Sequence, residues 1–178
     1  MLIKILLVLA ALVAVFLIVA AFQPDSFRVE RSATISAPPA IVFAQVNDLH
    51  AWQEFSPWAK LDPEAKNTYE GPRAGPGAAF AWSGNSKIGQ GRMTITESRP
   101  NELVRKKLDF IKPMESTSTA EFTFKPEGDK TVVTWSMYGP NNFIGKAFGL
   151  FFNCDKMCGD QFEKGLANLA TVVGSTTK

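Results

Sequence analysis

The sequence predicts an α+β domain in which a curved antiparallel sheet of about seven strands wraps around a long C-terminal helix, behind an N-terminal transmembrane helix. Three observations lead to this prediction. Residues 5–22 are uninterruptedly apolar. Seven later segments alternate apolar with polar residues and are separated by turn-forming residues. Residues 142–173 carry apolar side chains at helical spacing.

The N-terminal apolar segment, Ile5–Phe22, contains eighteen residues without a charge or a strongly polar side chain. A helix rises about 1.5 Å per residue and needs roughly 20 apolar residues to cross the hydrocarbon core. With Leu2, Ile3 and a snorkelling Lys4, the segment reaches that length. The alternative is a cleaved signal peptide, for which residues 19–21 would be a weak cleavage site. The length favours an uncleaved anchor.

We therefore divide the chain into residues 1–23, a transmembrane anchor or uncleaved signal segment, and residues 24–178, one domain with a single core. The positive charges on the two sides of the span nearly balance. A short tail before such an anchor usually stays in the cytoplasm, so the domain is expected outside it. We expect a monomer.

Nucleic acid is not expected as a partner. The formal net charge is +2, and the basic run at 105–107 is short. Strand alternation also places Lys106 on the face opposite Arg105 and Lys107. The chain therefore lacks an extended basic surface that could follow phosphates.

The soluble part begins with an alternating strand at 26–38, and the prolines at its end open a helix that reaches about residue 48. Residues 47–60 contain a short second helix, closed by Pro57. Six strand-like segments follow, separated by the Gly, Pro, Asn and Asp residues of hairpin turns: 67–71, 77–84, 87–98, 102–111, 115–126 and 130–139. A sheet this long must curl, and the terminal helix, from about Asn142 to Val173, must cover its concave face. Such an arrangement generally leaves a cavity between the two.

The order of these elements and the segments 34–58, 75–110 and 155–169 resemble the START-like superfamily. More narrowly, the chain is similar to the bacterial polyketide cyclase/dehydrase and lipid-transport group, often labelled SRPBCC. The resemblance covers about residues 26–173 and implies a helix-grip fold with a cavity for a hydrophobic ligand. Some members of this group cyclise polyketides, others carry lipids and others assist chaperones. The group shares a pocket and not a catalytic motif.

The single histidine, His50, lies between Trp52 and Trp58, with Asp48 and Glu54 close by in sequence. A general base needs an orienting carboxylate and a place beside the substrate. In the resemblance, this stretch is the corner that closes the mouth of the sheet, and the histidine is not among its recurring features. We therefore interpret the stretch as a packed corner, with a gate for the ligand as the alternative, and expect no catalytic residue here.

The terminal helix has one apolar stripe at about 100° per residue, consisting of Ile144, Phe148, Phe151, Cys158, Phe162, Leu166, Leu169 and Val173. Asp155 falls in the middle of this stripe. A buried carboxylate is costly unless it is paired or protonated. Asp155 is therefore either a structural partner of a lysine or arginine from the sheet, a residue exposed by a local bend, or a polar group inside the cavity.

Cys154 and Cys158 are four residues apart in the predicted helix. A disulfide within a helix at that spacing demands unusual geometry, and two thiols do not complete a zinc site. We interpret both as small apolar helix residues and expect neither a metal site nor a cofactor.

Alternation assigns the large apolar side chains of the strands to the concave face, where those near the centre of the sheet could touch a ligand. Together with the helix stripe, they define the candidate ligand-binding residues Trp82, Met93, Phe110, Phe122, Trp135, Met137, Phe148, Phe151 and Asp155. Three function classes follow: a non-catalytic binder of a hydrophobic small molecule or lipid, a polyketide cyclase/dehydrase-like enzyme, and a protein-interaction module that assists chaperones. The first is preferred because the sequence contains no evident catalytic constellation.

Overall fold

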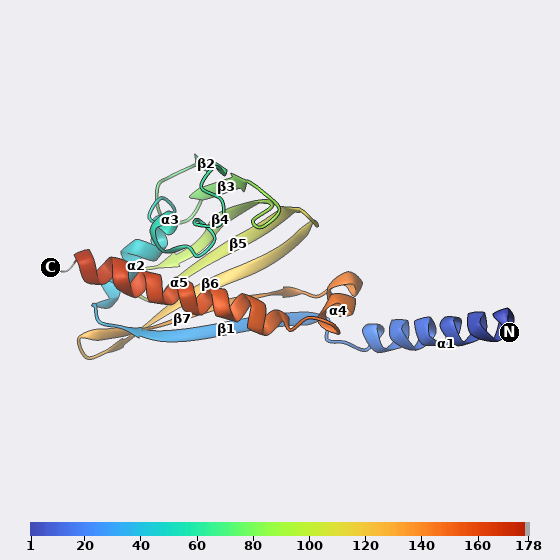
Figure 1. Ribbon diagram of the computed structural model, residues 1–178. Coiled ribbons are helices and arrows are strands. Elements are labelled where there is room, and N and C mark those ends of the chain that lie inside the picture. Colours follow the sequence, from blue (N-terminus) through green and yellow to red (C-terminus); the bar gives the residue numbers. More distant parts are fainter. Residues whose placement is uncertain (177–178) are drawn as a thin grey trace.

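The computed structural model of the chain describes residues 1–176 (Figure 1). Its seven strands form one sheet in the order β1-β7-β6-β5-β4-β3-β2, with every neighbouring pair antiparallel. The strands are β1 (Ser26–Ile35), β2 (Lys66–Glu70), β3 (Ala79–Ser83), β4 (Gln90–Arg99), β5 (Leu103–Lys112), β6 (Ser116–Glu127) and β7 (Lys130–Pro140). The predicted fold class is confirmed, including the number of strands.

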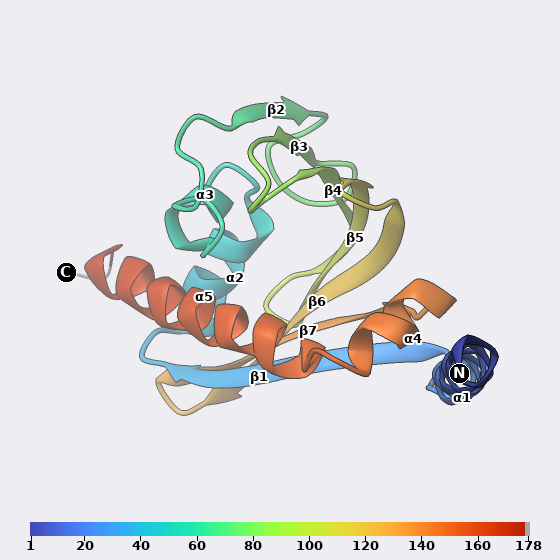
Figure 2. The same ribbon diagram turned by 45° about the vertical axis from the view of Figure 1, so that its right-hand side comes forward.

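The sheet is a meander of hairpins from β2 to β7, completed by the first strand of the domain. β1 returns to the far edge and pairs with β7 over ten residues of each strand, so that Arg31 lies opposite Trp135. The β4–β5 register shifts between Ile95 and Glu97, which marks a bulge. Bulges increase the local twist and bend a strand. Figure 2 shows the resulting curvature, with the sheet bent around the terminal helix.

Four helices accompany the sheet in the domain: α2 (Pro39–Asn47), α3 (Trp52–Phe55), α4 (Phe143–Gly149) and α5 (Cys154–Thr176). α5 crosses the concave face over β1 and β7, while α2 and α3 lie near its C-terminal half (Figures 1 and 2). The predicted short second helix is the single turn α3, whose Trp52 and Phe55 are buried. The sheet, α2, α3 and α5 thus surround one core.

The core confirms the alternation on which the strands were predicted. On β6 and β7, the inward residues Phe122, Phe124, Val133 and Trp135 are at most 5% exposed. The C-terminal part of the α5 stripe is equally buried and consists of Phe162, Leu166, Leu169 and Val173. Removal of this apolar surface from water is the main source of stability for the domain.

The prediction of one continuous helix from Asn142 to Val173 is wrong, because the segment contains two helices. The Asn142 side chain accepts a hydrogen bond from the backbone N–H of Gly145 at 2.9 Å and caps α4. The Asn153 side chain accepts one from the N–H of Lys156, also at 2.9 Å, and starts α5. Asn side chains accept hydrogen bonds from the free N–H groups at a helix N-terminus, so each of these asparagines favours the start of a separate helix. The break at residues 150–153 shifts the apolar stripe.

The N-terminal helix, α1 (Leu2–Ala21), extends away from the domain (Figure 1). Its length and mean hydropathy of 3.2 are sufficient for a membrane span, and its apolar stretch is not buried against the rest of the protein. A signal sequence near an N-terminus has the same properties. α1 meets the domain beside α4, where the rings of Phe16 and Phe151 lie 5.7 Å apart and Lys146 bonds Asp25 at 2.5 Å.

Candidate ligand-binding cavity

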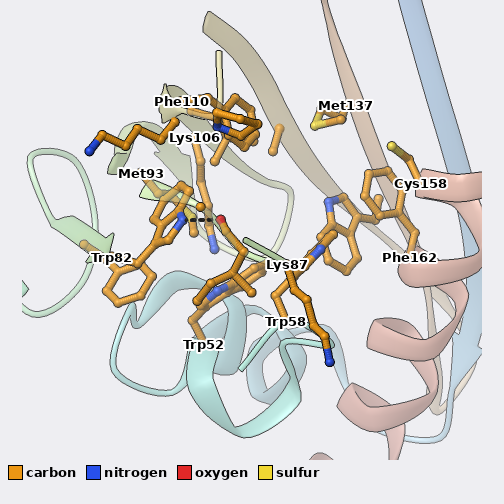
Figure 3. A pocket seen from close by; sticks show the side chains of 18 of the residues that line it. Trp52, Trp58, Trp82, Lys87, Met93, Lys106, Phe110, Met137, Cys158 and Phe162 are labelled. Atoms are coloured by element: carbon orange, nitrogen blue, oxygen red, sulfur yellow. Dashed lines mark hydrogen bonds between the residues drawn. The ribbon is translucent and has the colours of Figure 1, made fainter. Parts of the chain in front are cut away.

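A cavity of about 320 Å³ lies between the concave face of the sheet, α3 and the start of α5 (Figure 3). Strands β3 to β7, the β3–β4 turn, the β5–β6 turn and both helices contribute to its wall. The lining residues are Trp52, Trp58, Phe80, Trp82, Ser86, Lys87, Ile88, Gly89, Met93, Lys106, Leu108, Phe110, Lys112, Pro113, Ala120, Phe122, Trp135, Met137, Cys158 and Phe162. This volume is within the range of small-molecule sites.

All four tryptophans of the chain line the cavity. The Trp82 indole N–H donates to the carbonyl oxygen of Ile88 at 3.0 Å, which fixes the ring against the β3–β4 turn (Figure 3). On the neighbouring strand, a side chain at position 91 would collide with this ring, so Gly91 makes room for it. Aromatic rings held in this way form a preformed apolar wall.

The wall beside α5 is an aromatic stack centred on Trp135. Its ring stacks on Phe162 at 4.3 Å and on Phe122 at 4.7 Å, whereas Trp52 meets it edge-on at 5.5 Å. Gly165 on α5 leaves the space that the Trp135 ring occupies. The sheet, α3 and α5 are thereby joined through side chains that also face the cavity.

Lys106 is the unusual member of this lining. Its side chain is fully buried, and its Nζ makes no hydrogen bond to any residue of the described chain. Nζ lies 4.5 Å from the centre of the Trp52 ring and 5.2 Å from that of Phe122. Burial lowers the pKa of Lys106 to about 7, whereas the faces of the two nearby rings favour its charged form.

The polar groups of the lining are mainly donors and cations. The indole Nε1 of Trp135 is a second buried donor without a hydrogen-bond partner within residues 1–176. Lys87 and Lys112 also line the cavity, but their exposure places them at its mouth. Among the described residues, the wall contains no Asp or Glu. The cavity is therefore mainly apolar, and the charged side chains among its described lining residues are lysines.

Six of the nine candidate ligand-binding residues lie on the wall: Trp82, Met93, Phe110, Phe122, Trp135 and Met137. The other three do not. Phe148 and Phe151 are 44% and 73% exposed, because the helix break separates them from the buried part of the stripe. Phe151 contacts Phe16 of α1, and Phe148 stacks on Phe152. The expectation that they lie on a buried stripe is wrong.

The third of these residues, Asp155, is also exposed. Its carboxylate accepts from the Arg31 guanidinium at 2.9 and 3.2 Å, and the pairing with Arg31 lowers the pKa of Asp155. Arg31 reaches Glu163 at 3.0 Å as well and lies across Gly159, where any side chain would clash with it. Asp155 is therefore a surface partner of an arginine from β1, as one of the three alternatives proposed.

His50 lies outside the cavity. Its ring is stacked on Tyr69 at 3.9 Å, and its backbone N–H donates to the Asp48 carboxylate at 2.8 Å. The other Asp48 oxygen accepts from Arg73 at 2.5 Å. Asp48 therefore connects the segment around His50 to Arg73 in the β2–β3 loop, and it does not orient the His50 imidazole. The tryptophans of the corner lie on the wall.

Cys154 and Cys158 are free thiols. Cys158 is half-buried and lines the cavity, and burial raises its pKa. Within residues 1–176, no group of three or more His, Cys, Asp and Glu side chains is arranged to hold a metal ion.

Two features of the site were not recognised as functional from the sequence. Alternation places Lys106 on the face that Val104 and Leu108 share, opposite Arg105 and Lys107. A lysine that alternates with apolar residues along one face of a predicted strand indicates a polar group inside the core, and this pattern could have identified Lys106. The corner tryptophans were interpreted as packing, and no local pattern indicated that they would also face the cavity.

Residues 26–174 match the model of a family described as polyketide cyclase/dehydrase and lipid transport. The match covers the whole domain from β1 nearly to the end of α5. No curated protein matches the sequence. The structure is similar to many solved ones at low identity, which shows a shared fold.

One similar structure is that of a Chromobacterium violaceum protein, with a TM-score of 0.58 and 16% identity over 85% of this chain and 98% of that one. The Aha1 dimer from Colwellia psychrerythraea has a TM-score of 0.58 and 13% identity over 83% and 96%. DynU16, a protein of the dynemicin biosynthetic locus, has a TM-score of 0.59 and 12% identity over 86% of this chain and 49% of its own.

Proposed function

Because the chain belongs to the polyketide cyclase/dehydrase and lipid transport family, we propose that its domain binds a hydrophobic small molecule or lipid in the cavity without transforming it. The observation that carries this proposal is the cavity of about 320 Å³ walled by four tryptophans, three phenylalanines from the sheet and Phe162 of α5. Within the described chain, no nucleophile–base pair or metal cluster accompanies this wall. Binding therefore has stronger support than turnover.

The physical basis of binding is the apolar wall. Each square ångström of apolar surface that leaves water contributes about 25 cal/mol, before the ordering costs of association. The rings are held by their stacking and by the bond of Trp82 to the β3–β4 turn, so little conformational freedom is lost when a ligand enters. A rigid apolar site of this kind favours ligands with an aromatic or aliphatic body.

The test is to purify the full-length chain, extract it with organic solvent and identify the released molecules by mass spectrometry. The variant Ala120→Trp fills the cavity, since Ala120 lies on its wall. Ala167→Trp is the control, because Ala167 is exposed on α5. We expect a hydrophobic compound with the wild type and Ala167→Trp and its loss from Ala120→Trp. An empty wild-type cavity that also binds no member of a lipid panel would overturn the proposal.

We propose further that α1 anchors the domain to a membrane and that the domain lies outside the cytoplasm. The orientation rests on the short tail before the apolar segment. The anchor is supported by α1 and by an aromatic patch beside it, which consists of the exposed residues Phe143, Ile144, Phe148, Phe151, Phe152 and Met157. Phe16 lies five residues before the end of α1, which corresponds to about 8 Å of helix. Its contact with Phe151 supports a position of the patch near the membrane boundary if α1 spans the membrane.

Membrane attachment is tested by alkaline extraction of membranes and by the mass of the purified chain. A membrane-bound chain that retains residues 1–23 supports the anchor, and protease accessibility of the domain in intact cells tests its orientation. Deletion of residues 1–23 should release a folded domain, because α1 contributes only Ala20 to the buried residues. A soluble chain with a mature N-terminus near Phe22 would identify α1 as a signal peptide.

An enzyme of the polyketide cyclase/dehydrase type is the second candidate, and Lys106 is the observation that favours it. A buried amine with a pKa of about 7 is suited to general base catalysis at neutral pH. This role requires that Lys106→Met lower turnover of a poly-β-keto thioester by at least about a hundredfold while the variant stays folded. Absence of turnover by the wild type over a panel of such substrates would leave the binding role.

A further inference from the structure

The buried polar atoms of the cavity are two donors that the protein leaves unsatisfied. Lys106 Nζ and Trp135 Nε1 both make no hydrogen bond to any described residue, although each is fully enclosed. Buried donors without acceptors are rare in native proteins because each costs the free energy of desolvation. Both side chains line the cavity, and both contact the Trp52 and Phe122 rings.

The sign of the charge identifies the kind of acceptor. An ammonium group has three donors and no acceptor, and an indole N–H only donates. The ring faces of Trp52 and Phe122 favour a cation at the Lys106 position. Lys87 and Lys112 add positive charge at the mouth, and the described wall carries no carboxylate that could neutralise any of the three lysines.

We propose that the cavity selects an apolar molecule with a carboxylate at one end, and that this carboxylate pairs with Lys106 inside the cavity. This inference rests on the proposed binding function and adds its ligand class. The apolar body of the ligand lies against the tryptophans, and Trp135 Nε1 offers a second bond to an oxygen of the ligand. The lysines at the mouth attract the acid, and Lys106 holds it.

The test uses three probes with one skeleton: 6-phenylhexanoic acid, 6-phenylhexan-1-ol and 6-phenylhexylamine. Each is titrated into the full-length chain in nanodiscs by calorimetry, with empty nanodiscs as the blank for partition into lipid. Tryptophan fluorescence is the second readout, because all four tryptophans lie on the wall. We expect the acid to bind at least tenfold more tightly than the alcohol and the amine to bind most weakly.

The variants separate the charge from the apolar wall. Lys106→Met should remove the preference for the acid and leave the affinity for the alcohol within a few-fold. Lys107→Met is the matched control, because Lys107 is exposed on the opposite face of β5 and pairs with Asp109. It should retain the preference. Equal affinity for acid and alcohol in the wild type, or a preference that survives Lys106→Met, would overturn the carboxylate proposal but not the cavity. No binding of any probe or lipid would overturn the binding function itself.

Proton uptake gives a measurement that needs no variant. With a pKa of about 7, most Lys106 side chains are neutral at pH 8, and a bound carboxylate raises that pKa. The other titratable groups on the wall are Lys87, Lys112 and Cys158, of which only Cys158 is half-buried. Calorimetry at pH 8 in two buffers of different ionisation heat should show uptake of up to about one proton with the acid and none with the alcohol. Binding of the acid without proton uptake would contradict the pairing with Lys106.

Discussion

The Nζ atom of Lys106 lies 4.5 Å from the centre of the Trp52 ring, with no hydrogen-bond acceptor for it in the described chain. Lys106 belongs to the middle of the sheet and Trp52 to the corner that covers it. Neither side chain has this environment until β5, α3 and β6 have come together. The same contact therefore involves an aromatic side chain of the cavity wall and the buried lysine that supplies the charge inside the cavity.

The first prediction is that Lys106→Met stabilises the ligand-free protein. Burial lowers the pKa of Lys106 from 10.5 to about 7, so the unfolded chain holds a proton between these values that the folded chain lacks. The free energy of unfolding therefore rises with pH across this window, and the cost of the buried lysine is complete below about pH 7. Removal of the amine should add roughly 2–5 kcal/mol at pH 6 and progressively less toward pH 10.

Denaturant unfolding of wild type and variant at pH 6, 8 and 9.5 checks this prediction. Lys107→Met, on the other face of β5, should show no comparable dependence on pH. A stability difference that stays constant from pH 6 to 9.5 would mean that the Lys106 pKa is not lowered in the folded state.

The second prediction contrasts Trp52 with His50 in the same corner. Trp52→Ala removes a ring that contacts Phe55, Phe122 and Trp135 and should lower the free energy of unfolding by about 3–5 kcal/mol. His50→Gln removes only an exposed stack on Tyr69 and should cost less than about 1 kcal/mol, with ligand binding unchanged. Thermal melts and titrations of both variants provide the comparison. A folded His50→Gln protein without activity or binding would refute the interpretation of this corner.

The third prediction is that Asp155→Asn has little effect. Asp155 is on the surface, and Arg31 keeps Glu163 as a partner when the Asp155 charge is lost. We expect the melting temperature at pH 7 to fall by no more than about 3 °C, with unchanged binding to the cavity. Pairing with Arg31 lowers the pKa of Asp155, so its contribution is present above the pKa of the unfolded carboxyl and disappears as the pH falls through the folded pKa.

Melts of the Asp155→Asn variant at pH 7 and in the acid range measure this contribution. The double variant Asp155→Asn, Glu163→Gln leaves Arg31 without either carboxylate and should melt lower than the single variant. Weaker ligand binding by Asp155→Asn alone would show that the residue acts on the cavity.

The fourth prediction concerns the aromatic patch. The double variant Phe151→Asp, Phe152→Asp should reduce binding of the domain without residues 1–23 to phosphatidylcholine vesicles by at least about tenfold, since each buried aromatic ring contributes roughly 1.5–3 kcal/mol. Leu61→Asp is the control, because Leu61 is an exposed apolar residue in the segment between α3 and β2. These two elements lie away from α4 (Figures 1 and 2). Co-sedimentation with vesicles is the measurement. Equal sedimentation of the unmodified domain, the double variant and the Leu61→Asp variant would show that the patch does not bind the vesicles. The patch would then serve another partner.

The sequence by itself determined the order of the strands along the chain and the face that each residue occupies. Successive side chains of a strand point to opposite faces, so the apolar alternation around Phe122 and Trp135 was sufficient to place both inside. The uninterrupted apolar composition of α1 likewise needs no tertiary context, since its length alone meets the requirement for a membrane span. The same local rules placed Lys106 on the inner face.

The tertiary structure decided what those inner faces meet. A stripe at 100° per residue assumes one continuous helix, and the break at residues 150–153 separates Phe148 and Phe151 from the buried part of the stripe. Asp155 lies in the first turn of α5, where it is exposed and pairs with Arg31. Whether Lys106 finds a carboxylate, water or an aromatic ring depends on the curvature of the sheet and on the docking of α3, which bring together residues more than fifty positions apart. Periodicity predicts the face of a strand or helix on which a side chain lies, but it does not predict which residues pack against that face. The position of the Lys106 charge inside the cavity is therefore decided by the tertiary structure.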